Sequence, residues 1–290
     1  MKKILITGAD SYIGMNVEAH LKNHGDYEID TVDMKDGTWR EKSFSGYDSV
    51  FHVAGIAHLN HKKMSLEEKE ALYYGVNTDL AFEVAQKSKA DGVKQFIFMS
   101  SASVYGDGAS VGKPRMITRE TKEVPSNIYG ESKLRAERKI LPLNSDSFTV
   151  AVLRPPMIYG KNCPGNYASL SKMAKKLPVF PKVKNERSMI YIGNFAEFVR
   201  LIIDNQDGGI FMPQNSEYSI TSELISMIAE AHGKRIRLLK GFAWLLKLVA
   251  PFTGLVNKAF GNFTYDFLLS NYKNNYQVYE LKESIEITEK

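Results

Sequence analysis

Three polar side chains have the types and the spacing of an acid–base group. Tyr129 and Lys133 lie four residues apart in a predicted helix over 129–140, so both side chains project from one face. A tyrosine titrates at about pH 10, and a neighbouring ammonium lowers its pKa toward neutral pH. Ser101 follows a predicted strand over 95–100, where its hydroxyl can orient a substrate oxygen. The three residues therefore predict proton transfer to or from a substrate hydroxyl.

A second group of residues has the pattern of a phosphate-binding turn. A predicted strand over 2–6 runs into TGADSYIG (7–14), and a predicted helix over 12–24 follows. A helix that begins after such a turn presents backbone N–H groups and the positive end of its dipole to an anion. Gly8 permits the tight turn, and Gly14 permits close packing of the helix against the strand.

A carboxylate after the second predicted strand indicates which dinucleotide would bind. Asp33 ends the strand predicted over 28–33 and lies 19 residues after Gly14. A carboxylate at this point can accept hydrogen bonds from both ribose hydroxyls and repels a 2′-phosphate, which favours NAD over NADP. Asp36 is the competing candidate. Ser11 stands where the dinucleotide fingerprint has its middle glycine, so it adds a hydroxyl and crowds the backbone.

The elements that must position these residues alternate between strand and helix. The predicted strands are 2–6, 28–33, 49–54, 95–100 and 148–154, and the predicted helices are 12–24, 66–89 with an interruption at Gly75, and 129–140. Alternation with nearly continuous apolar strands is typical of a parallel sheet covered on both faces. The fold class is therefore predicted to be α/β, a doubly wound parallel sheet (Rossmann-like). Only 15 residues separate Asp33 from Ser49, too few for a further strand and helix.

The pattern changes after residue 155, where prolines interrupt short loops and helices. Regularity returns over 188–212 with an apolar helix and a strand, and a helix is predicted over 222–232. We predict a dinucleotide-binding domain formed by 1–155 plus 188–212. A smaller C-terminal substrate-binding lobe would be formed by 156–187 plus 213–290.

Composition excludes several classes of protein. The chain has 290 residues, of which 43% are hydrophobic and 24% charged, so neither a disordered nor a fibrous protein is expected. The net charge of +5 is scattered along the chain, which favours anionic ligands and argues against nucleic-acid binding. The single cysteine, Cys163, cannot form an internal disulfide, which is typical of a reducing cytoplasm. The initial apolar run is only Ile4-Leu5-Ile6, so no signal peptide is expected.

Two further signals predict no additional site. The most apolar stretch, FAWLLKLVAPF (242–252), is shorter than a bilayer-spanning helix, so no integral membrane segment is expected. We interpret it as a buried helix or a lid over a pocket, with peripheral membrane contact as the alternative. The histidines His52, His58 and His61 lack a nearby carboxylate or cysteine, and no metal site is predicted.

Five sequence blocks in order resemble a known family. They are TGADSYIG (7–14), FHVAGIAH (51–58), FMSSASVYG (98–106), YGESKLRAE (129–137) and LRPPMIYG (153–160). The chain over about 1–235 resembles the extended short-chain dehydrogenase/reductase family of the NAD-dependent epimerase/dehydratase type, most closely its nucleotide-sugar epimerases. Ser11, the short segment after Asp33 and the small second lobe depart from the family pattern.

The resemblance implies a role for particular residues. Ser101, rather than Ser100 or Ser103, aligns with the catalytic serine, beside Tyr129 and Lys133. The implied NAD-binding residues are Gly8, Ser11, Tyr12, Ile13, Gly14, Asp33, Val53, Ala54, Gly55, Asn77, Tyr129, Lys133 and Pro156. The implied substrate-binding residues are Ser101, Ser103, Asn166 and Arg187, the last at a position that grips the phosphates of a sugar nucleotide.

The same family hosts 4-epimerases, 4,6-dehydratases and reductases, so the fold does not decide the reaction. Dehydratases place Asp-Glu after the catalytic hydroxyl, whereas this chain has Ala102-Ser103. We predict an NAD-dependent nucleotide-sugar 4-epimerase acting on a UDP-sugar or another nucleotide sugar through a transient 4-keto sugar, with Tyr129 as acid/base. The alternatives are an NAD(P)H-dependent 4-keto-sugar reductase of polysaccharide biosynthesis and a non-catalytic NAD-binding sensor or scaffold. The resemblance also implies a homodimer formed through helices near 76–90 and 129–140.

Overall fold

The computed structural model describes residues 1–57, 64–241 and 260–290, which form two compact units. The first unit consists of Met1–Gly106, Glu123–Pro155 and Phe195–Met212, and the second consists of Asp107–Lys122, Pro156–Asn194 and Pro213–Lys290. His58, His61 and the apolar stretch 242–252 lie outside the described residues.

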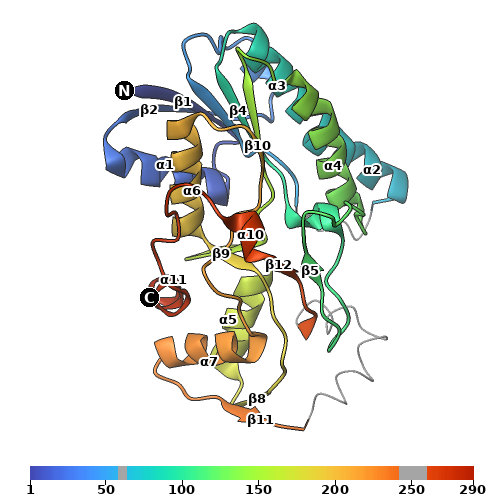
Figure 1. Cartoon of the computed structure of the whole chain (residues 1–290), viewed down its shortest axis with the longest axis vertical. Helices are drawn as coiled ribbons and strands as arrows, with labels where there is room; N and C mark the ends of the chain where they lie inside the picture. Colours follow the sequence, from blue (N-terminus) through green and yellow to red (C-terminus); the bar gives the residue numbers. More distant parts are fainter. Residues whose placement is uncertain (58–63, 242–259) are drawn as a thin grey trace. The chain divides into compact units, whose positions relative to one another are not determined.

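The first unit is built on a six-stranded sheet (Figure 1). Its strands are β1 (Lys2–Thr7), β2 (Tyr27–Val32), β3 (Ser49–His52), β4 (Gln95–Met99), β6 (Thr149–Leu153) and β10 (Gly209–Phe211). They follow the order β10-β6-β4-β3-β1-β2, and every pair is parallel. The chain moves outward from β1 to β2 and then crosses to β3 on the other side of β1. The predicted doubly wound parallel sheet is confirmed, and its switch point lies between β1 and β3.

Helices cover both faces of this sheet, because its strands are apolar on both sides. Figure 1 shows α1 (Tyr12–His24) and α6 (Ile192–Asn205) on one face, and α2 (Leu66–Tyr74), α3 (Ala81–Ala90) and α4 (Ile128–Ile140) on the other. The core between α3, α4 and the sheet contains fully buried side chains such as Phe96, Phe98 and Val150. Asn127 caps α4 by accepting a hydrogen bond from the Gly130 N–H group at 2.9 Å.

The predicted helix over 66–89 is interrupted at Gly75, as expected. Between α2 and α3 the chain forms a π-helical segment, η2 (Gly75–Leu80). Such wide turns rotate the side chains that follow and are frequent at functional sites. This one carries the buried Asn77 and Thr78.

The segment between β2 and β3 contains one short 3₁₀ helix, η1 (Thr38–Arg40), and no strand within residues 33–48, all of which are described. Trp39 and Phe44 are buried there, so the segment closes the end of the core. As a result, β2 pairs only with β1 among the described strands and forms one edge of the sheet.

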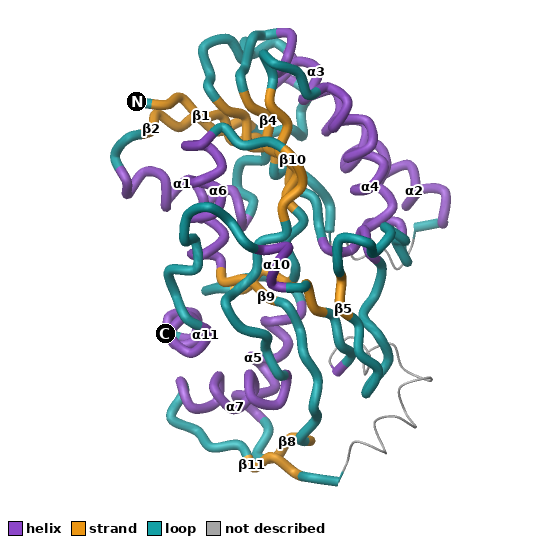
Figure 2. The backbone as a smooth tube through the Cα atoms, in the orientation of Figure 1, coloured by secondary structure: helices purple, strands orange, loops and turns teal. Residues whose placement is uncertain are grey.

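The second unit has little regular structure, and Figure 2 shows how much of it is loop. Its described strands form three parallel pairs: β5 (Met116–Ile117) with β12 (Thr264–Tyr265), β7 (Met157–Tyr159) with β9 (Met189–Tyr191), and β8 (Val179–Pro181) with β11 (Arg237–Leu239). Its helices are α5 (Asn166–Lys176), α7 (Thr221–Ala231), α10 (Phe267–Ser270) and α11 (Leu281–Glu289). No helix among the described residues is long and apolar enough to cross a bilayer.

The compact units differ from the predicted domain bounds at two places. Residues 107–122 belong to the second unit, because β5 pairs with β12 and Ala109 N–H donates to the Asn262 carbonyl. Residues 188–194 also belong there, because β9 pairs with β7. The division into a cofactor domain and a substrate lobe stays a prediction.

Candidate functional site

The turn after β1 requires glycine at its first position. Gly8 has φ +99°, in the region that favours glycine. A Cβ at Gly8 would lie 2.7 Å from the Ala54 nitrogen, so the backbones of Gly8 and Ala54 are too close for a side chain at Gly8. The Gly8 N–H group donates to the Val32 carbonyl at 2.9 Å. These contacts fix the turn between the ends of β1, β2 and β3.

Ser11, which stands where the fingerprint has a glycine, is the N-cap of α1. Its hydroxyl accepts a hydrogen bond from Gly14 N–H at 3.1 Å. A Cβ at Gly14 would lie 2.6 Å from that oxygen and 3.2 Å from Val53 Cγ1, so Gly14 is required at this contact. Tyr12 and Ile13 open the helix, and their turn forms the positive end of its dipole.

The two candidate ribose carboxylates, Asp33 and Asp36, have different local contacts. Asp36 Oδ1 accepts hydrogen bonds from the Thr38 N–H group at 3.1 Å and hydroxyl at 2.8 Å, which lower its pKa and hold it at the start of η1. Asp33 is exposed, directly follows the Val32 carbonyl that anchors Gly8, and has only local contacts with Lys35. Asp33 thus lies next to the turn after β1, and its role toward a ribose stays a prediction.

The loop after β3 lies against the same turn. The N–H groups of Val53 and Ala54 both donate to the Thr7 carbonyl, at 3.1 and 3.0 Å. A Cβ at Gly55 would lie 3.1 Å from both Asn77 Oδ1 and Lys133 Nζ. The loop therefore joins the phosphate turn to the residues on η2 and α4.

Asn77 fixes this loop through hydrogen bonds in two directions. Its Oδ1 accepts from Ile56 N–H at 2.8 Å, and its Nδ2 donates to the Ile56 carbonyl and to Ser132 Oγ, both at 3.0 Å. Thr78 Oγ1 donates to the Ser132 carbonyl at 2.7 Å. The π-helical segment thus connects the β3 loop to α4, next to Lys133.

The Ser101 and Tyr129 side chains interact, and their catalytic role stays a prediction. Burial raises the pKa of the Tyr129 hydroxyl, and a hydrogen bond with the Ser101 side chain counteracts part of this increase. Ser101 Oγ also accepts from Ser103 N–H at 3.1 Å, which holds the serine at the start of the 3₁₀ helix η3 (Ala102–Tyr105). The Tyr73 ring contacts the Tyr129 ring edge-on, with centroids 6.5 Å apart.

Lys133 is buried, with 3% of its surface exposed. Its ammonium donates to the Met99 carbonyl at 2.8 Å and lies 4.8 Å from the Phe98 ring centre. Burial lowers the pKa of Lys133 to about 8, and the charge of Glu137 counteracts part of this effect. Lys133 is thus a buried cation held between the end of β4 and the loop at Gly55.

Sequence analysis missed a buried ion pair next to Lys133. Arg154 Nη2 lies 2.5 Å from Glu137 Oε2, and the two side chains are 3% and 1% exposed. Ser100 Oγ also donates to Glu137, and Arg154 Nη1 donates to Glu123 at 2.9 Å. The signal in the sequence is the i, i+4 spacing of Lys133 and Glu137, but nothing in it identifies Arg154 as the partner.

The remaining predicted site residues lie in the second unit. Pro156 is buried, and Asn166 is exposed at the first position of α5. Arg187 is half-buried, which lowers its pKa, and its Nη1 donates to the Gly261 carbonyl at 3.2 Å. Ser101 and Ser103 belong to the first unit, so the substrate role of this set stays a prediction.

His52 and Cys163 have structural surroundings. Burial lowers the pKa of His52 to about 3, its Nδ1 pairs with Thr7 Oγ1 at 2.7 Å, and its ring stacks on Phe96 and Phe98. Cys163 is buried, which raises the pKa of its thiol and disfavours the nucleophilic thiolate.

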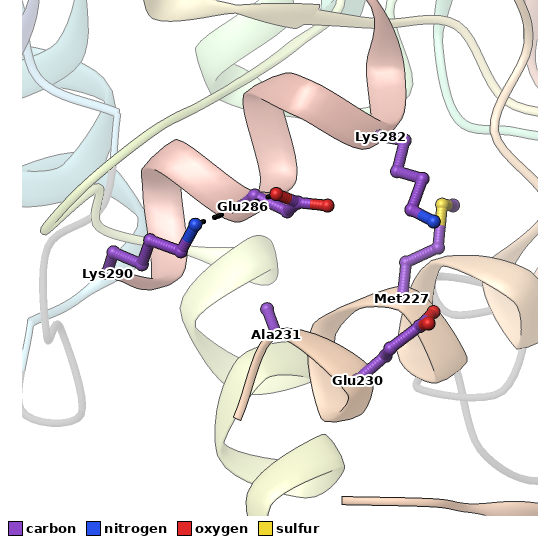
Figure 3. A pocket seen from close by; sticks show the side chains of 6 residues that line it. All are labelled: Met227, Glu230, Ala231, Lys282, Glu286 and Lys290. Atoms are coloured by element: carbon purple, nitrogen blue, oxygen red, sulfur yellow. Dashed lines mark ion pairs between the residues drawn. The ribbon is translucent and has the colours of Figure 1, made fainter. Parts of the chain in front are cut away.

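A pocket of about 240 Å³ opens in the second unit between α7 and α11 (Figure 3). Its lining residues are Met227, Glu230, Ala231, Lys282, Glu286 and Lys290. None of the predicted site residues lines it, and its charges are mixed.

Known proteins are similar to this chain in sequence. The model of the NAD dependent epimerase/dehydratase family matches residues 4–212. The chain is 29% identical over 279 residues to a UDP-glucose 4-epimerase of Vibrio cholerae, covering 87% of this chain and 83% of the relative. It is 27% identical over 224 residues to an N-acetyl-alpha-D-glucosaminyl-diphospho-ditrans,octacis-undecaprenol 4-epimerase of Escherichia coli O157:H7, covering 71% and 64%.

Solved structures share the fold. The UDP-glucuronic acid 4-epimerase of Bacillus cereus, in complex with NAD, has a TM-score of 0.72 at 18% identity, covering 98% of this chain and 96% of that chain. The dTDP-4-dehydrorhamnose reductase of Bacillus anthracis, in complex with NADP, has a TM-score of 0.72 at 20% identity, covering 99% of each. An epimerase and a reductase therefore match this fold equally well.

Proposed function

We propose that this chain, which belongs to the NAD-dependent epimerase/dehydratase family, is a nucleotide-sugar 4-epimerase. The approach of α4 to the end of β4 is the observation that carries the proposal: Lys133 Nζ donates to the Met99 carbonyl at 2.8 Å, and the Ser101 side chain interacts with the Tyr129 hydroxyl. This arrangement supplies a positioned acid–base group. The sequence similarity to a UDP-glucose 4-epimerase over most of both chains supports this reaction among those of the family.

The residues present fit a dinucleotide, because the turn between β1 and α1 leaves no room for a side chain at Gly8 or Gly14. The first turn of α1 would hold the pyrophosphate, and Asp33 would accept the adenosine ribose hydroxyls. Lys133 and the loop at Gly55 would lie against the nicotinamide half. When bound, NAD would accept a hydride from C4 of the sugar and return it to the opposite face.

Tyr129 would remove the proton of the 4-hydroxyl and later return it. Ser101 would donate a hydrogen bond to the same sugar oxygen and orient it. Because burial raises the pKa of Tyr129, the hydroxyl needs cationic help to ionise near neutral pH. In the proposal, Lys133, one helical turn away, supplies that charge. Glu137, one further turn along α4, pairs with Arg154.

Substrate conversion without added reductant separates the candidate reactions. Incubation with UDP-galactose or UDP-N-acetylgalactosamine, without added NADH, should give the 4-epimer, because the hydride is returned. A strict requirement for stoichiometric NADH with a 4-keto sugar would instead identify the reductase. Tight binding of NAD with no turnover on either substrate would identify a sensor or scaffold.

Replacing Tyr129 by phenylalanine tests the acid–base group. We expect Tyr129→Phe to lower kcat by about 10²–10⁴-fold, because it removes the proton-transferring hydroxyl, while NAD affinity stays near wild type. Tyr74→Phe, which removes a hydroxyl from nearby α2, is the matched control and should retain activity. Retained turnover in Tyr129→Phe would refute the assignment.

The carboxylate beside the phosphate turn sets the expected cofactor preference. Asp33→Ala should reduce discrimination against NADP by about 10–100-fold, because it removes a charged hydrogen-bond acceptor and the repulsion of a 2′-phosphate. The ratio of Kd values for NADP and NAD, measured by fluorescence titration, reports this change. The control is Asp36→Ala, and a larger shift in that variant would transfer the role to Asp36.

We also propose a homodimer formed through α3 and α4, and a cytoplasmic location. Light scattering of the purified protein should give a mass near twice 32.7 kDa. A monomer at micromolar concentration would contradict the dimer.

A further inference from the structure

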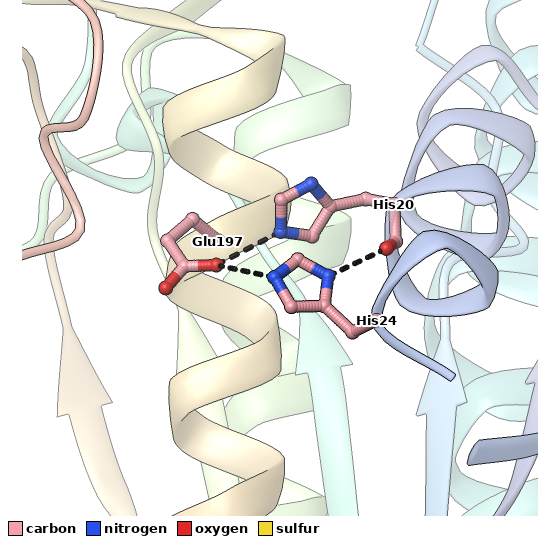
Figure 4. Close-up of side chains that lie close together, drawn as sticks. All are labelled: His20, His24 and Glu197. Carbon is pink, nitrogen blue, oxygen red and sulfur yellow. Dashed lines mark hydrogen bonds and ion pairs between the residues drawn. The ribbon is translucent and has the colours of Figure 1, made fainter. Parts of the chain in front are cut away.

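Two histidines and a glutamate converge on the surface of the first unit (Figure 4). His20 and His24 lie one turn apart on α1, and Glu197 projects from the neighbouring α6. One ligand atom from each residue lies within 4.8 Å of the others. The proposed reaction uses none of the three.

The spacing of these atoms suits a tetrahedral cation. Glu197 Oε2 lies 2.9 Å from His20 Nε2 and 4.0 Å from His24 Nε2. Zinc bonds of about 2.0–2.1 Å at tetrahedral angles place ligand atoms about 3.4 Å apart. The two observed separations lie on either side of that value, so small side-chain rotations would complete the geometry.

The hydrogen bonds orient a lone pair of His24 toward the cluster. His24 Nδ1 lies 2.9 Å from the His20 carbonyl, which can only accept, so Nδ1 carries the proton. In the neutral ring Nε2 is then unprotonated and faces Glu197 (Figure 4). A backbone carbonyl bound to the second ring nitrogen is the usual support of a metal-binding histidine.

The Glu197 carboxylate also pairs with an arginine of its own helix. Burial opposes ionisation of Glu197, but hydrogen bonds from Arg200 and His20 lower its pKa to about 2. Arg200 is shared, because it also donates to Asp204 at 2.6 Å. Arg200 donates to both oxygens of Glu197, at 2.8 and 2.6 Å, and Lys2 Nζ lies 3.9 Å from Asp204. The convergence of the three ligand atoms therefore carries the case for a cation, which would compete with Arg200 for Glu197 Oε2.

We propose that His20, His24 and Glu197 bind one borderline divalent cation of the Zn²⁺ class, with water as the fourth ligand. The cation would replace the Nε2 proton of His20, which would pass to water, and it would link α1 to α6. Since α1 carries the phosphate turn at its start, the site would stabilise the part of the unit proposed to bind NAD. The proposal does not depend on the reaction catalysed.

Sequence analysis predicted no metal site. The i, i+4 spacing of two histidines is visible in the sequence, but the carboxylate is 177 positions from His20 and is identified only by the fold.

Cation affinity of the tag-free full chain tests this site. Competition with a chromophoric chelator should show one tight Zn²⁺ per chain, and Co²⁺ should give the visible absorption of a tetrahedral complex. His24→Gln should weaken Zn²⁺ binding by at least about tenfold, because it removes a ligand. This side chain is 39% exposed, so its loss leaves the core intact. His20→Gln should give the same loss.

The matched control is His232→Gln, which removes a histidine that pairs with one carboxylate, Glu289, at 2.7 Å. Its Zn²⁺ affinity should equal that of wild type. Saturating Zn²⁺ should also raise the unfolding temperature of wild type and His232→Gln, but not of His24→Gln. Equal Zn²⁺ affinity in wild type and His24→Gln, or an equal loss in His232→Gln, would overturn the proposal.

Discussion

The two units are stabilised in different ways. The first has a continuous parallel sheet with apolar side chains on both faces, so backbone ladders satisfy its polar groups and hydrophobic contacts fill its core. Where the second unit is described, its strands form three separate pairs, and buried side chains supply further hydrogen bonds. Its stability therefore depends more on individual polar residues.

Asn215 illustrates this dependence. Its Oδ1 accepts from Tyr191 N–H at 3.0 Å and from Asn194 Nδ2 at 3.2 Å, and its Nδ2 donates to Tyr159 at 3.0 Å. Tyr159 in turn contacts Ser284 Oγ at 2.5 Å. One buried amide thus joins four segments that are distant in the sequence.

A polar cluster of the first unit surrounds Glu137 and Arg154 and adjoins the catalytic candidates. Another buried polar pair, Ser49 with Gln95, lies at the opposite end of the strands, at the start of β3 and β4. The comparison teaches that the first unit adds buried polar groups to a continuous sheet, whereas in the second unit such groups connect segments that no shared sheet joins. Three substitutions test this contrast.

The largest effect is expected at the buried ion pair. Glu137→Gln removes the buried carboxylate that pairs with Arg154, and breaking a buried pair costs about 3–5 kcal/mol. Urea denaturation measures the loss in the free energy of unfolding. Glu131→Gln breaks the exposed pair with Arg135 on the same helix and should cost about 0.5 kcal/mol or less. Equal losses would show that burial does not distinguish the two pairs.

The next effect depends on pH. Because the pKa of Lys133 is about 8 in the folded chain and near 10.5 when unfolded, the unfolded state binds an extra proton between these values. Stability from this group therefore rises with pH across that window, by about 3 kcal/mol in total. Lys133→Met should lack the rise. The measurement is urea denaturation of both proteins at several pH values, and parallel pH profiles would contradict the assigned pKa.

The smallest effect is expected in the second unit. Asn215→Ala leaves buried polar partners unsatisfied and should cost about 1–3 kcal/mol. Hydrogen exchange should show faster opening of β7 and β9, whose segments it joins. Asn271→Ala, at an exposed position, should change stability by less than about 0.5 kcal/mol. No change in exchange for Asn215→Ala would remove the contrast between the units.

The sequence predicted the first unit well because its elements carry local signals. The strands β1, β4 and β6 are apolar runs, α1 begins after a capping serine, and Gly75 marks the break between α2 and α3. The short segment after Asp33 correctly indicated that no strand–helix unit fits before β3. These features depend on neighbours within a few residues.

The rest depends on contacts between distant residues. The described strands of the second unit have only two or three residues. Each forms because a distant strand pairs with it, as β12 pairs with β5. The pairing of Glu137 with Arg154 and the approach of Glu197 to His20 likewise follow from the fold. At the candidate site, the sequence predicted roles for Ser101 and Tyr129, which stay predictions, but it did not predict the orientation of Lys133 toward Gly55.

Because no strand–helix unit lies between Asp33 and Ser49, β2 is an edge strand, and this affects contacts between copies of the protein. An edge strand such as β2 exposes backbone groups to which a second chain can add a strand. Here Glu28 is exposed and pairs with Lys3, and Asp30 accepts a hydrogen bond from Tyr47. Charges on an edge strand oppose intermolecular pairing. The charged side chains of β2 therefore oppose aggregation through this edge strand.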